Sequence, residues 1–205
     1  MTEISKRRRF DSRRELTSKR FRFNFFDVLF LNRPLNPMNL KLEPIRESHA
    51  PSLAIHANSP NVFAGLRGSF PFPYQLQDAL DYIRACLRDS RSRTFAILFE
   101  ENTIGIITLL FKEDVYRFNG EIGYWIGEEF WNRGIVTQAI QSIINIAYTE
   151  HGLHRVYAEV FSNRPASARA LEKNGFVLDG TNKEAVFKDG VFLDQWIYSR
   201  LRDGV

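Results

Sequence analysis

The stretch WNRGIVTQAI, residues 131–140, places an arginine and a glycine directly before an apolar segment with helical spacing. The first N–H groups of a helix have no acceptor within the helix, and together with the helix dipole they attract anions. Gly134 would let such a ligand approach the backbone closely, and Arg133 would add a positive charge. We therefore interpret this turn as a candidate pyrophosphate site. The alternative is that Gly134 only allows the backbone to turn and that no ligand binds there.

The turn matches neither of the common nucleotide-binding loops. The sequence contains no Gly-Lys-Ser or Gly-Lys-Thr, and the three-glycine dinucleotide pattern is also missing. His151 and His154 form no zinc-binding spacing with the distant Cys86. Nothing in the sequence supports a Ser-His-Asp hydrolase, and we expect no metal site.

Periodicity identifies the elements that must position this turn. Alternating apolar residues predict strands over 39–45, 94–100, 103–111, 121–127, 155–161 and 191–201. Helical spacing predicts helices over 75–88, 135–150 and 167–174, with a further short helix capped by Ser48. The turn thus joins a strand to a helix, and another strand follows. This order predicts a single α/β domain in which helices cover both faces of a mixed sheet.

A basic N-terminal segment dominates the net charge of the chain. Residues 1–22 hold nine Lys/Arg and three Asp/Glu, a net charge of +6, whereas the rest of the chain carries −2. We expect residues 1–38 to form a flexible or partly docked extension before a domain over 39–205. Clustered arginines could bind RNA or the ribosome by releasing counterions from phosphates. A mobile terminus is one alternative, and a mitochondrial presequence, which would avoid the three acidic residues, is another.

The composition of the chain restricts the cellular compartments in which we expect the protein. No apolar run approaches the ~20 residues of a membrane span, so we expect no membrane contact. The single cysteine, Cys86, cannot form a disulfide within the chain and fits a reducing compartment. We expect a cytoplasmic protein, with mitochondria as the alternative.

Two neighbouring motifs carry a family resemblance. The segment EIGYWIGEEFWNRGIVTQAI (121–140), followed by HRVYAEVFSNRPASARALEKNGFVLDG (154–180), resembles the GCN5-related N-acetyltransferase (GNAT) superfamily. It is most similar to the RimJ/RimL-like branch of ribosomal-protein N-terminal acetyltransferases. The resemblance covers roughly residues 39–202. It implies a mixed, mostly antiparallel sheet in which one pair of central strands splays apart.

The resemblance also implies a cosubstrate, acetyl-CoA, and a set of contacts to it. The turn would wrap the pyrophosphate, the end of the preceding strand would pair with the pantetheine arm, and Ser167 would face the sulfur. The implied binding residues are Trp125, Ile126, Gly127, Asn132, Arg133, Gly134, Ile135, Val136, Thr137, Asn163, Arg164 and Ser167.

The chain departs from the family pattern at several positions. Trp131 stands where Arg or Gln is common, and Val136 stands where Gly or Ala is common. Arg164 replaces the Asn that usually contacts the pantetheine amide, and Asn163 is displaced by one residue. Leu171 stands where many relatives carry a tyrosine that protonates the leaving thiolate.

Acetyl transfer needs a neutral amine, a stabilised oxyanion and a proton for the thiolate. Glu121 is our candidate base, acting through water, although a surface glutamate at a strand end is the alternative. Backbone N–H groups near Trp125 and Ile126 could hold the oxyanion. Tyr124 is a candidate proton donor, with a core tyrosine as the alternative.

The sequence therefore predicts an acetyl-CoA-dependent N-acetyltransferase, acting alone or as a homodimer. The predicted acceptor is the α-amine of a protein N-terminus, and a small-molecule amine is the alternative. A relative that binds coenzyme A or RNA without turnover is the second class of function left open.

Overall fold

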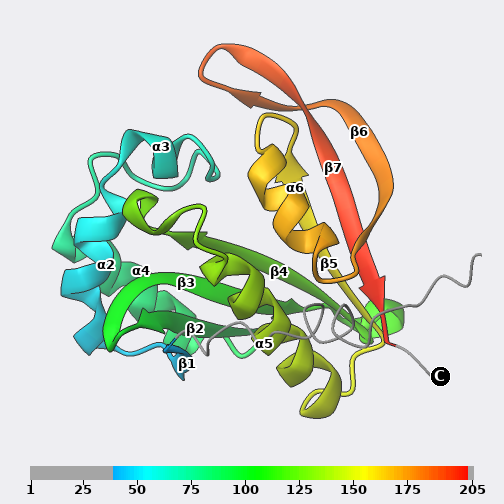
Figure 1. Ribbon diagram of the computed structural model, residues 1–205, viewed down its shortest axis with the longest axis horizontal. Coiled ribbons are helices and arrows are strands. Elements are labelled where there is room, and N and C mark those ends of the chain that lie inside the picture. Colours follow the sequence, from blue (N-terminus) through cyan, green and yellow to red (C-terminus); the bar gives the residue numbers. More distant parts are fainter. Residues whose placement is uncertain (1–38, 203–205) are drawn as a thin grey trace, which may run out of the picture. The chain divides into compact units, whose positions relative to one another are not determined.

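The computed structural model describes residues 39–202 (Figure 1), so the basic extension over 1–38 lies outside the described residues. Within them, seven strands form one sheet in the order β1-β2-β3-β4-β5-β7-β6. The strands are β1 (Leu40–Pro44), β2 (Ser92–Phe99), β3 (Asn102–Phe111), β4 (Asn119–Ile126), β5 (Arg155–Phe161), β6 (Val177–Lys188) and β7 (Val191–Leu201). All neighbours pair antiparallel except β4 and β5, which are parallel. The predicted mixed, mostly antiparallel sheet is confirmed.

The parallel pair at the centre of the sheet is short. Pairing between β4 and β5 covers Asn119↔Arg155, Gly120↔Val156 and Glu121↔Tyr157, and no later rung joins the two strands. Beyond Glu121 each strand keeps only its outer partner, β3 for β4 and β7 for β5. The two central strands therefore separate, as the family resemblance implied.

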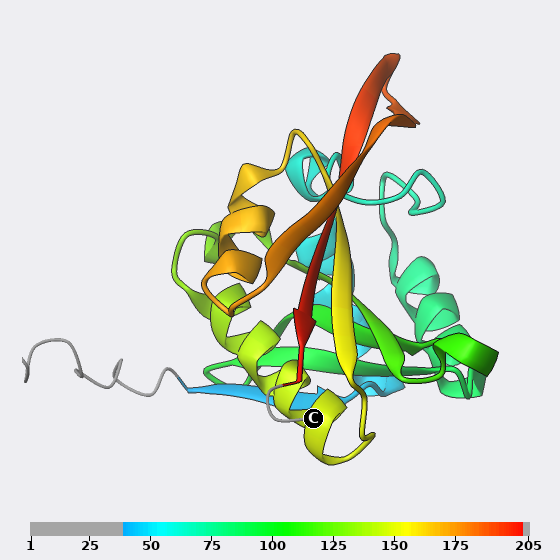
Figure 2. The same ribbon diagram turned by 90° about the vertical axis from the view of Figure 1, so that its right-hand side faces the viewer.

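Helices cover both faces of the sheet (Figure 2), as the sequence predicted. They are α2 (Ala50–Ala57), α3 (Pro60–Phe63), α4 (Leu76–Arg88), α5 (Ile135–Thr149) and α6 (Pro165–Glu172), with 3₁₀ turns η1 (Glu47–His49), η2 (Asp114–Tyr116) and η3 (Glu128–Phe130). Among residues 39–202, no helix combines the length and apolarity needed to cross a membrane.

Alternation along the strands divides the core into two layers. Ile97 and Ile107 face α5, whereas their neighbours Ala96 and Ile106 face α2 and α4. On α5 the apolar face predicted from helical spacing is buried, comprising Ile140, Ile143, Ile144 and Ala147. Both faces of the sheet are thus desolvated, which fixes the register of the strands.

Two sequence-based expectations for the first helices are wrong. Ser48 lies inside η1 and does not cap a helix, because the chain enters α2 directly from that 3₁₀ turn through His49. On α4 the predicted apolar face is shifted, since Ala79 and Ile83 are buried while Leu76 and Leu87 are exposed. Fully buried alanines, Ala50 and Ala57 on α2 and Ala79 on α4, let these helices pack closely, while Leu76 and Leu87 of α4 lie at the rim.

One glycine is required for β3 and β4 to pair. A Cβ at Gly105 would lie 2.7 Å from Ile126 Cα and would also collide with the Trp125 carbonyl oxygen. Both are backbone atoms, so the strand itself would have to move. We expect Gly105→Ala to lower the free energy of unfolding in urea by about 3 kcal/mol or more, at the upper end of overpacking costs.

The matched control for this prediction is Gly123→Ala on β4. A Cβ at Gly123 meets nothing within 4 Å. Alanine also restricts the unfolded chain more than glycine does, so the change in unfolding free energy should stay within about 1 kcal/mol. Equal stability losses in the two variants would contradict the steric argument.

Candidate active site

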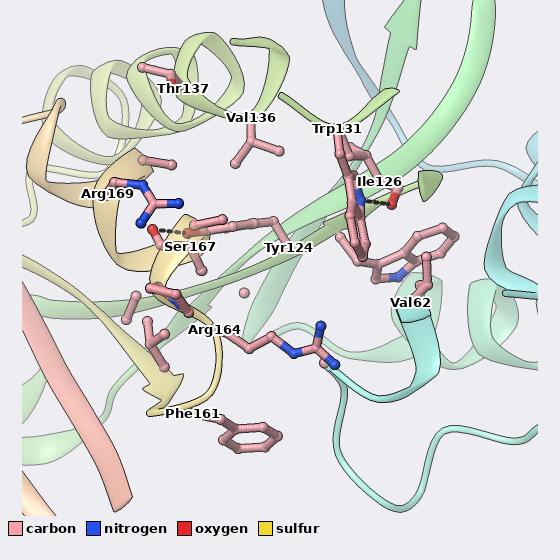
Figure 3. Close-up of a pocket in the computed structure, with 18 of the residues that line it drawn as sticks. Val62, Tyr124, Ile126, Trp131, Val136, Thr137, Phe161, Arg164, Ser167 and Arg169 are labelled. Carbon is pink, nitrogen blue, oxygen red and sulfur yellow. Dashed lines mark hydrogen bonds between the residues drawn. The ribbon is translucent and has the colours of Figure 1, made fainter. Parts of the chain in front are cut away.

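A cavity of about 580 Å³ occupies the gap between the separated strands. Its walls come from β4, β5, the first turns of α5 and α6, and the loop that follows α3 (Figure 3). Because only β4 and β5 separate in this way, the cavity gives access to backbone atoms at the centre of the sheet. Such concave sites with a few converging polar groups are where ligands usually bind.

The turn singled out in the sequence forms one end of this cavity. Asn132 and Gly134 adopt left-handed conformations, with φ of 60° and 78°, and this bends the chain sharply into α5. The indole Nε1 of Trp131 donates a 3.0 Å hydrogen bond to the Ile126 carbonyl oxygen and ties the turn to the end of β4. Residues 132–137 all line the cavity. The first N–H groups of α5, which lack intrahelical acceptors, therefore border the cavity as predicted.

The connection before this turn is held by side chains of the first helices. Glu128 in η3 accepts hydrogen bonds from Ser59 Oγ and Asn61 Nδ2, each at 2.7 Å, and these bonds lower the pKa of its carboxyl. The neighbouring Glu129 Oε1 lies 2.5 Å from His56 Nδ1. The turn before α5 is thus anchored to α2 and α3 as well as to the sheet.

The backbone of β4 presents alternate N–H groups to the cavity. The Gly127 N–H donates to the Ile104 carbonyl at 2.8 Å, so it faces β3. Since N–H directions alternate along a strand, Trp125 also faces β3, and the groups that open toward the gap are those of Tyr124 and Ile126. Sequence reasoning grouped Trp125 with Ile126 and included Gly127, but Gly127 does not line the cavity. The register of β4 against β3, which cannot be read from the sequence, decides which of these N–H groups open toward the gap.

Tyr124 and Ser167 meet in the middle of the cavity (Figure 3). The Tyr124 hydroxyl lies 2.8 Å from Ser167 Oγ, a contact between β4 and the first turn of α6. Burial raises the pKa of Tyr124 to about 12, and the bond to Ser167 only partly opposes this. The phenol therefore keeps its proton at neutral pH. It is in a position to donate that proton to a group bound in the gap.

Glu121 lies where the two central strands part, because its pairing with Tyr157 is the last rung between them. Its Oε2 forms an ion pair with Lys112 Nζ at 2.8 Å and accepts a 3.3 Å hydrogen bond from the Tyr157 hydroxyl. Its Oε1 forms an ion pair with Arg67 Nη2 at 3.2 Å. The carboxylate lines the cavity but both oxygens are engaged. A water relay to Glu121 would have to compete with Arg67, whose side chain is 72% exposed.

Most residues predicted for the site line the same cavity. They are Glu121, Tyr124, Trp125, Ile126, Asn132, Arg133, Gly134, Ile135, Val136, Thr137, Asn163, Arg164 and Ser167. The roles assigned to them stay predictions. Within residues 39–202 no group of three His, Cys, Asp or Glu is arranged to hold a metal ion.

Several lining residues escaped the sequence analysis. Val62 and Arg67 come from α3 and the loop after it, and Glu159 and Phe161 come from β5. No local motif marks the α3 loop, and strand residues reach the cavity only because β5 has no neighbour on that side. Asn174 was also missed; its Nδ2 donates to the carbonyls of Thr137 (3.0 Å) and Ala170 (2.9 Å), joining α6 to the first turn of α5.

Comparisons with known proteins agree with this architecture. A family model described as an acetyltransferase (GNAT) domain matches residues 39–177. The chain is 33% identical to the ribosomal-protein-serine acetyltransferase of Escherichia coli (strain K12) over 55% of this chain. It is 26% identical to the spermidine N(1)-acetyltransferase of Vibrio cholerae over 61% of this chain and 73% of that protein.

A solved structure shows the same fold. RimL, a ribosomal L7/L12 alpha-N-protein acetyltransferase in complex with coenzyme A, superposes with a TM-score of 0.71 over 80% of this chain and 94% of that one, at 21% identity. Identity this low supports the fold alone. The match to the Escherichia coli relative spans 62% of that protein's length, less than two thirds of it.

The left-handed turn at Gly134 generates a prediction about anion binding. We expect Gly134→Asp to weaken the binding of coenzyme A at least tenfold in calorimetry, because a carboxylate there repels the pyrophosphate. Gly134→Asn is the matched control, since asparagine has nearly the same size and tolerates the same left-handed backbone without the charge. Equal affinities for the Asp and Asn variants would show that the turn does not carry an anion.

Proposed function

Since the chain belongs to the GNAT acetyltransferase family, we propose that it transfers an acetyl group from acetyl-CoA to a primary amine, the N-terminal α-amine of a protein. The observation that carries this proposal is the gap between β4 and β5, bordered at one end by the first turn of α5. The N–H groups of that turn suit a pyrophosphate. The free edge of β4 suits an extended, amide-containing arm, which can pair with it as an added strand would.

The charges in the cavity fit the cosubstrate. Arg133 lines it from the turn before α5, and Arg169 and Lys173 line it from α6 and its end, where phosphate groups would lie beside the start of α5. The thioester would then reach the Tyr124–Ser167 pair. Tyr124 would hold its proton until the sulfur leaves as a thiolate, and the N–H groups of Tyr124 and Ile126 would stabilise the developing oxyanion.

The preference for an α-amine follows from its protonation. An α-amine has a pKa of about 7.7–8.0, so a sizeable fraction is neutral at neutral pH, whereas lysine at about 10.4 is almost fully charged. Both oxygens of Glu121 are engaged by Lys112, Tyr157 and Arg67, so little carboxylate capacity is free to deprotonate a lysine. Correct positioning of a partly neutral amine supplies much of the rate enhancement. Ribosomal-protein acetyltransferases among the relatives support the same class of acceptor.

A small-molecule amine is the second candidate acceptor. It is favoured by the likeness to the spermidine N(1)-acetyltransferase. The two candidates differ in what surrounds the reacting amine, because a polyamine carries further cations and a peptide carries amides.

The deciding measurement compares two peptides that each contain one internal lysine, one with a free and one with a blocked N-terminus. We expect release of free coenzyme A to be at least tenfold faster with the free peptide, and mass spectrometry to place the acetyl group on its α-amine. Equal rates on the blocked peptide would contradict the α-amine assignment. Inert peptides combined with turnover of spermidine would replace it by the small-amine candidate.

Substitutions at Tyr124 and Glu121 test the proton transfers. Tyr124→Phe should lower kcat by about 10²-fold, and Glu121→Gln should lower it by 10²-fold or less, within the usual range for one acid–base group. Because the pKa of Tyr124 is about 12, the phenol stays protonated well above neutral pH. The rate should therefore rise with pH only as the substrate amine loses its proton, with an apparent pKa of about 8. A descending limb below pH 9 that Tyr124→Phe removes would contradict this assignment.

A further inference from the structure

Arg164 extends across the end of the cavity that lies away from α5. It precedes α6, and its side chain reaches toward α3 and Val62 (Figure 3). The Arg164 Nε lies 3.3 Å from the position that a Cβ on Gly65 would take. The guanidinium thus rests against the loop after α3, and the missing side chain at Gly65 leaves room for it.

The charge of Arg164 is not balanced by the part of the chain that the structure describes. No carboxylate of residues 39–202 forms an ion pair with it, and its Nε is shielded from solvent without a hydrogen-bond acceptor. A buried donor without a partner is costly, and a guanidinium costs more than a neutral group. The Nε and Nη groups of arginine form a planar fork that matches a carboxylate.

A second cation adds to the positive potential at this end. Lys188, from β6, donates to the Phe63 carbonyl at 2.8 Å and to the Leu66 carbonyl, and so it holds the α3 loop against the β6–β7 hairpin. Burial lowers the pKa of Lys188; the neighbouring Asp189 opposes this shift, and the charge of Arg164 adds to it. The two cations are close enough to interact, and two carbonyls already accept from Lys188, whereas the Arg164 Nε has no acceptor among residues 39–202.

This end of the cavity differs from the end that suits the phosphates. In Figure 3 the Tyr124–Ser167 pair lies between Thr137 and Arg169 on one side and Arg164 with Val62 on the other. A ligand group at Arg164 would therefore belong to the acceptor and not to the pyrophosphate.

The same region also contains two carboxylates that suit an ammonium group. Arg67 Nη2 bridges Glu121 at 3.2 Å and Glu159 at 3.4 Å, and all three residues line the cavity. An incoming amine would have to displace the exposed Arg67 to reach these carboxylates. Negative and positive groups are thus presented to one acceptor molecule.

We propose that Arg164 selects acceptors that carry a carboxylate close to the reacting amine. This inference rests on the proposed acetyl transfer and refines its substrate class. The carboxylate could be an acidic side chain at the second position of a peptide or the α-carboxylate of a free amino acid. A polyamine, which has no anionic group, is disfavoured by Arg164 and Lys188.

The test compares acceptors that differ only in this charge. Steady-state kinetics are measured with the peptides Ser-Asp-Ala-Ala-Phe-amide and Ser-Asn-Ala-Ala-Phe-amide, with serine and serinamide, and with spermidine. In the unmodified protein the carboxylate-bearing member of one pair should have a kcat/KM at least about tenfold higher, as expected for one charge-assisted pair. The pair that shows the difference identifies the source of the carboxylate.

Variants then assign the selectivity to Arg164. Arg164→Gln should remove the tenfold preference by raising the KM of the acidic acceptor, while the KM of acetyl-CoA stays within about threefold. Arg164→Lys, which keeps the charge, should restore part of the preference. Arg88→Gln, on the exposed last turn of α4 and away from the cavity lining, should leave all acceptor kinetics unchanged.

A paired substitution in the α3 loop tests the position of the guanidinium without removing it. Gly65→Ala puts a Cβ against Arg164, whereas Gly68→Ala meets nothing within 4 Å. Only Gly65→Ala should reduce the preference for the acidic acceptor. A circular dichroism melt confirms that both variants are folded.

Three results would overturn the proposal. Equal turnover of charged and neutral acceptors by the unmodified protein refutes it and leaves acetyl transfer intact. A raised KM for acetyl-CoA in Arg164→Gln, with acceptor selectivity unchanged, assigns the residue to the cosubstrate. Absence of turnover with every amine, despite coenzyme A binding, refutes the proposed function itself and this inference with it.

Discussion

The separation of β4 from β5 is the constraint on which the rest of the site depends. Three rungs hold the strands together up to Glu121 and Tyr157, and beyond them each strand has lost one neighbour. An exposed strand edge inside a sheet would normally be a liability, because its N–H and C=O groups have no partners. Here the edge faces a cavity of about 580 Å³, where the Trp131 indole satisfies the Ile126 carbonyl and a ligand can supply further partners.

Hydrogen bonds hold the elements on both sides of the gap between β4 and β5. On one side Trp131 bonds to Ile126, and Glu128 is held by Ser59 and Asn61, so the turn before α5 cannot fold into the gap. On the other side Asn174 joins α6 to α5. These hydrogen bonds fix the elements that border the gap on either side. Such preorganisation lowers the cost of binding a ligand between them.

Electrostatics divides the cavity into regions with different tasks. Arg133 and the N–H groups of α5 make one end attractive to phosphates, and Arg164 makes the opposite end attractive to another anion. Between them lies the neutral Tyr124–Ser167 pair, where a proton is held by a phenol whose pKa is about 12. The carboxylates of Glu121 and Glu159 share Arg67, and all three residues line the cavity. Under the proposed function, this arrangement would orient a ligand by charge at both ends and leave its middle to the reacting groups.

The sequence by itself determined most of the elements and the turn at the start of α5, although it did not predict β6 or α3. Strands 155–161 and 191–201 were located to the residue, α5 was located to within one residue, and the turn at Gly134 was recognised. These features are local, since the period of apolar residues and the chemistry of a helix start are both written in neighbouring positions. Only the tertiary structure decided which N–H groups of β4 face the gap, which face of α4 is buried, and that Glu159, Arg67 and Arg164 line the same cavity. Those properties depend on register and on contacts between residues far apart in the chain, where a shift of one residue reverses every side chain.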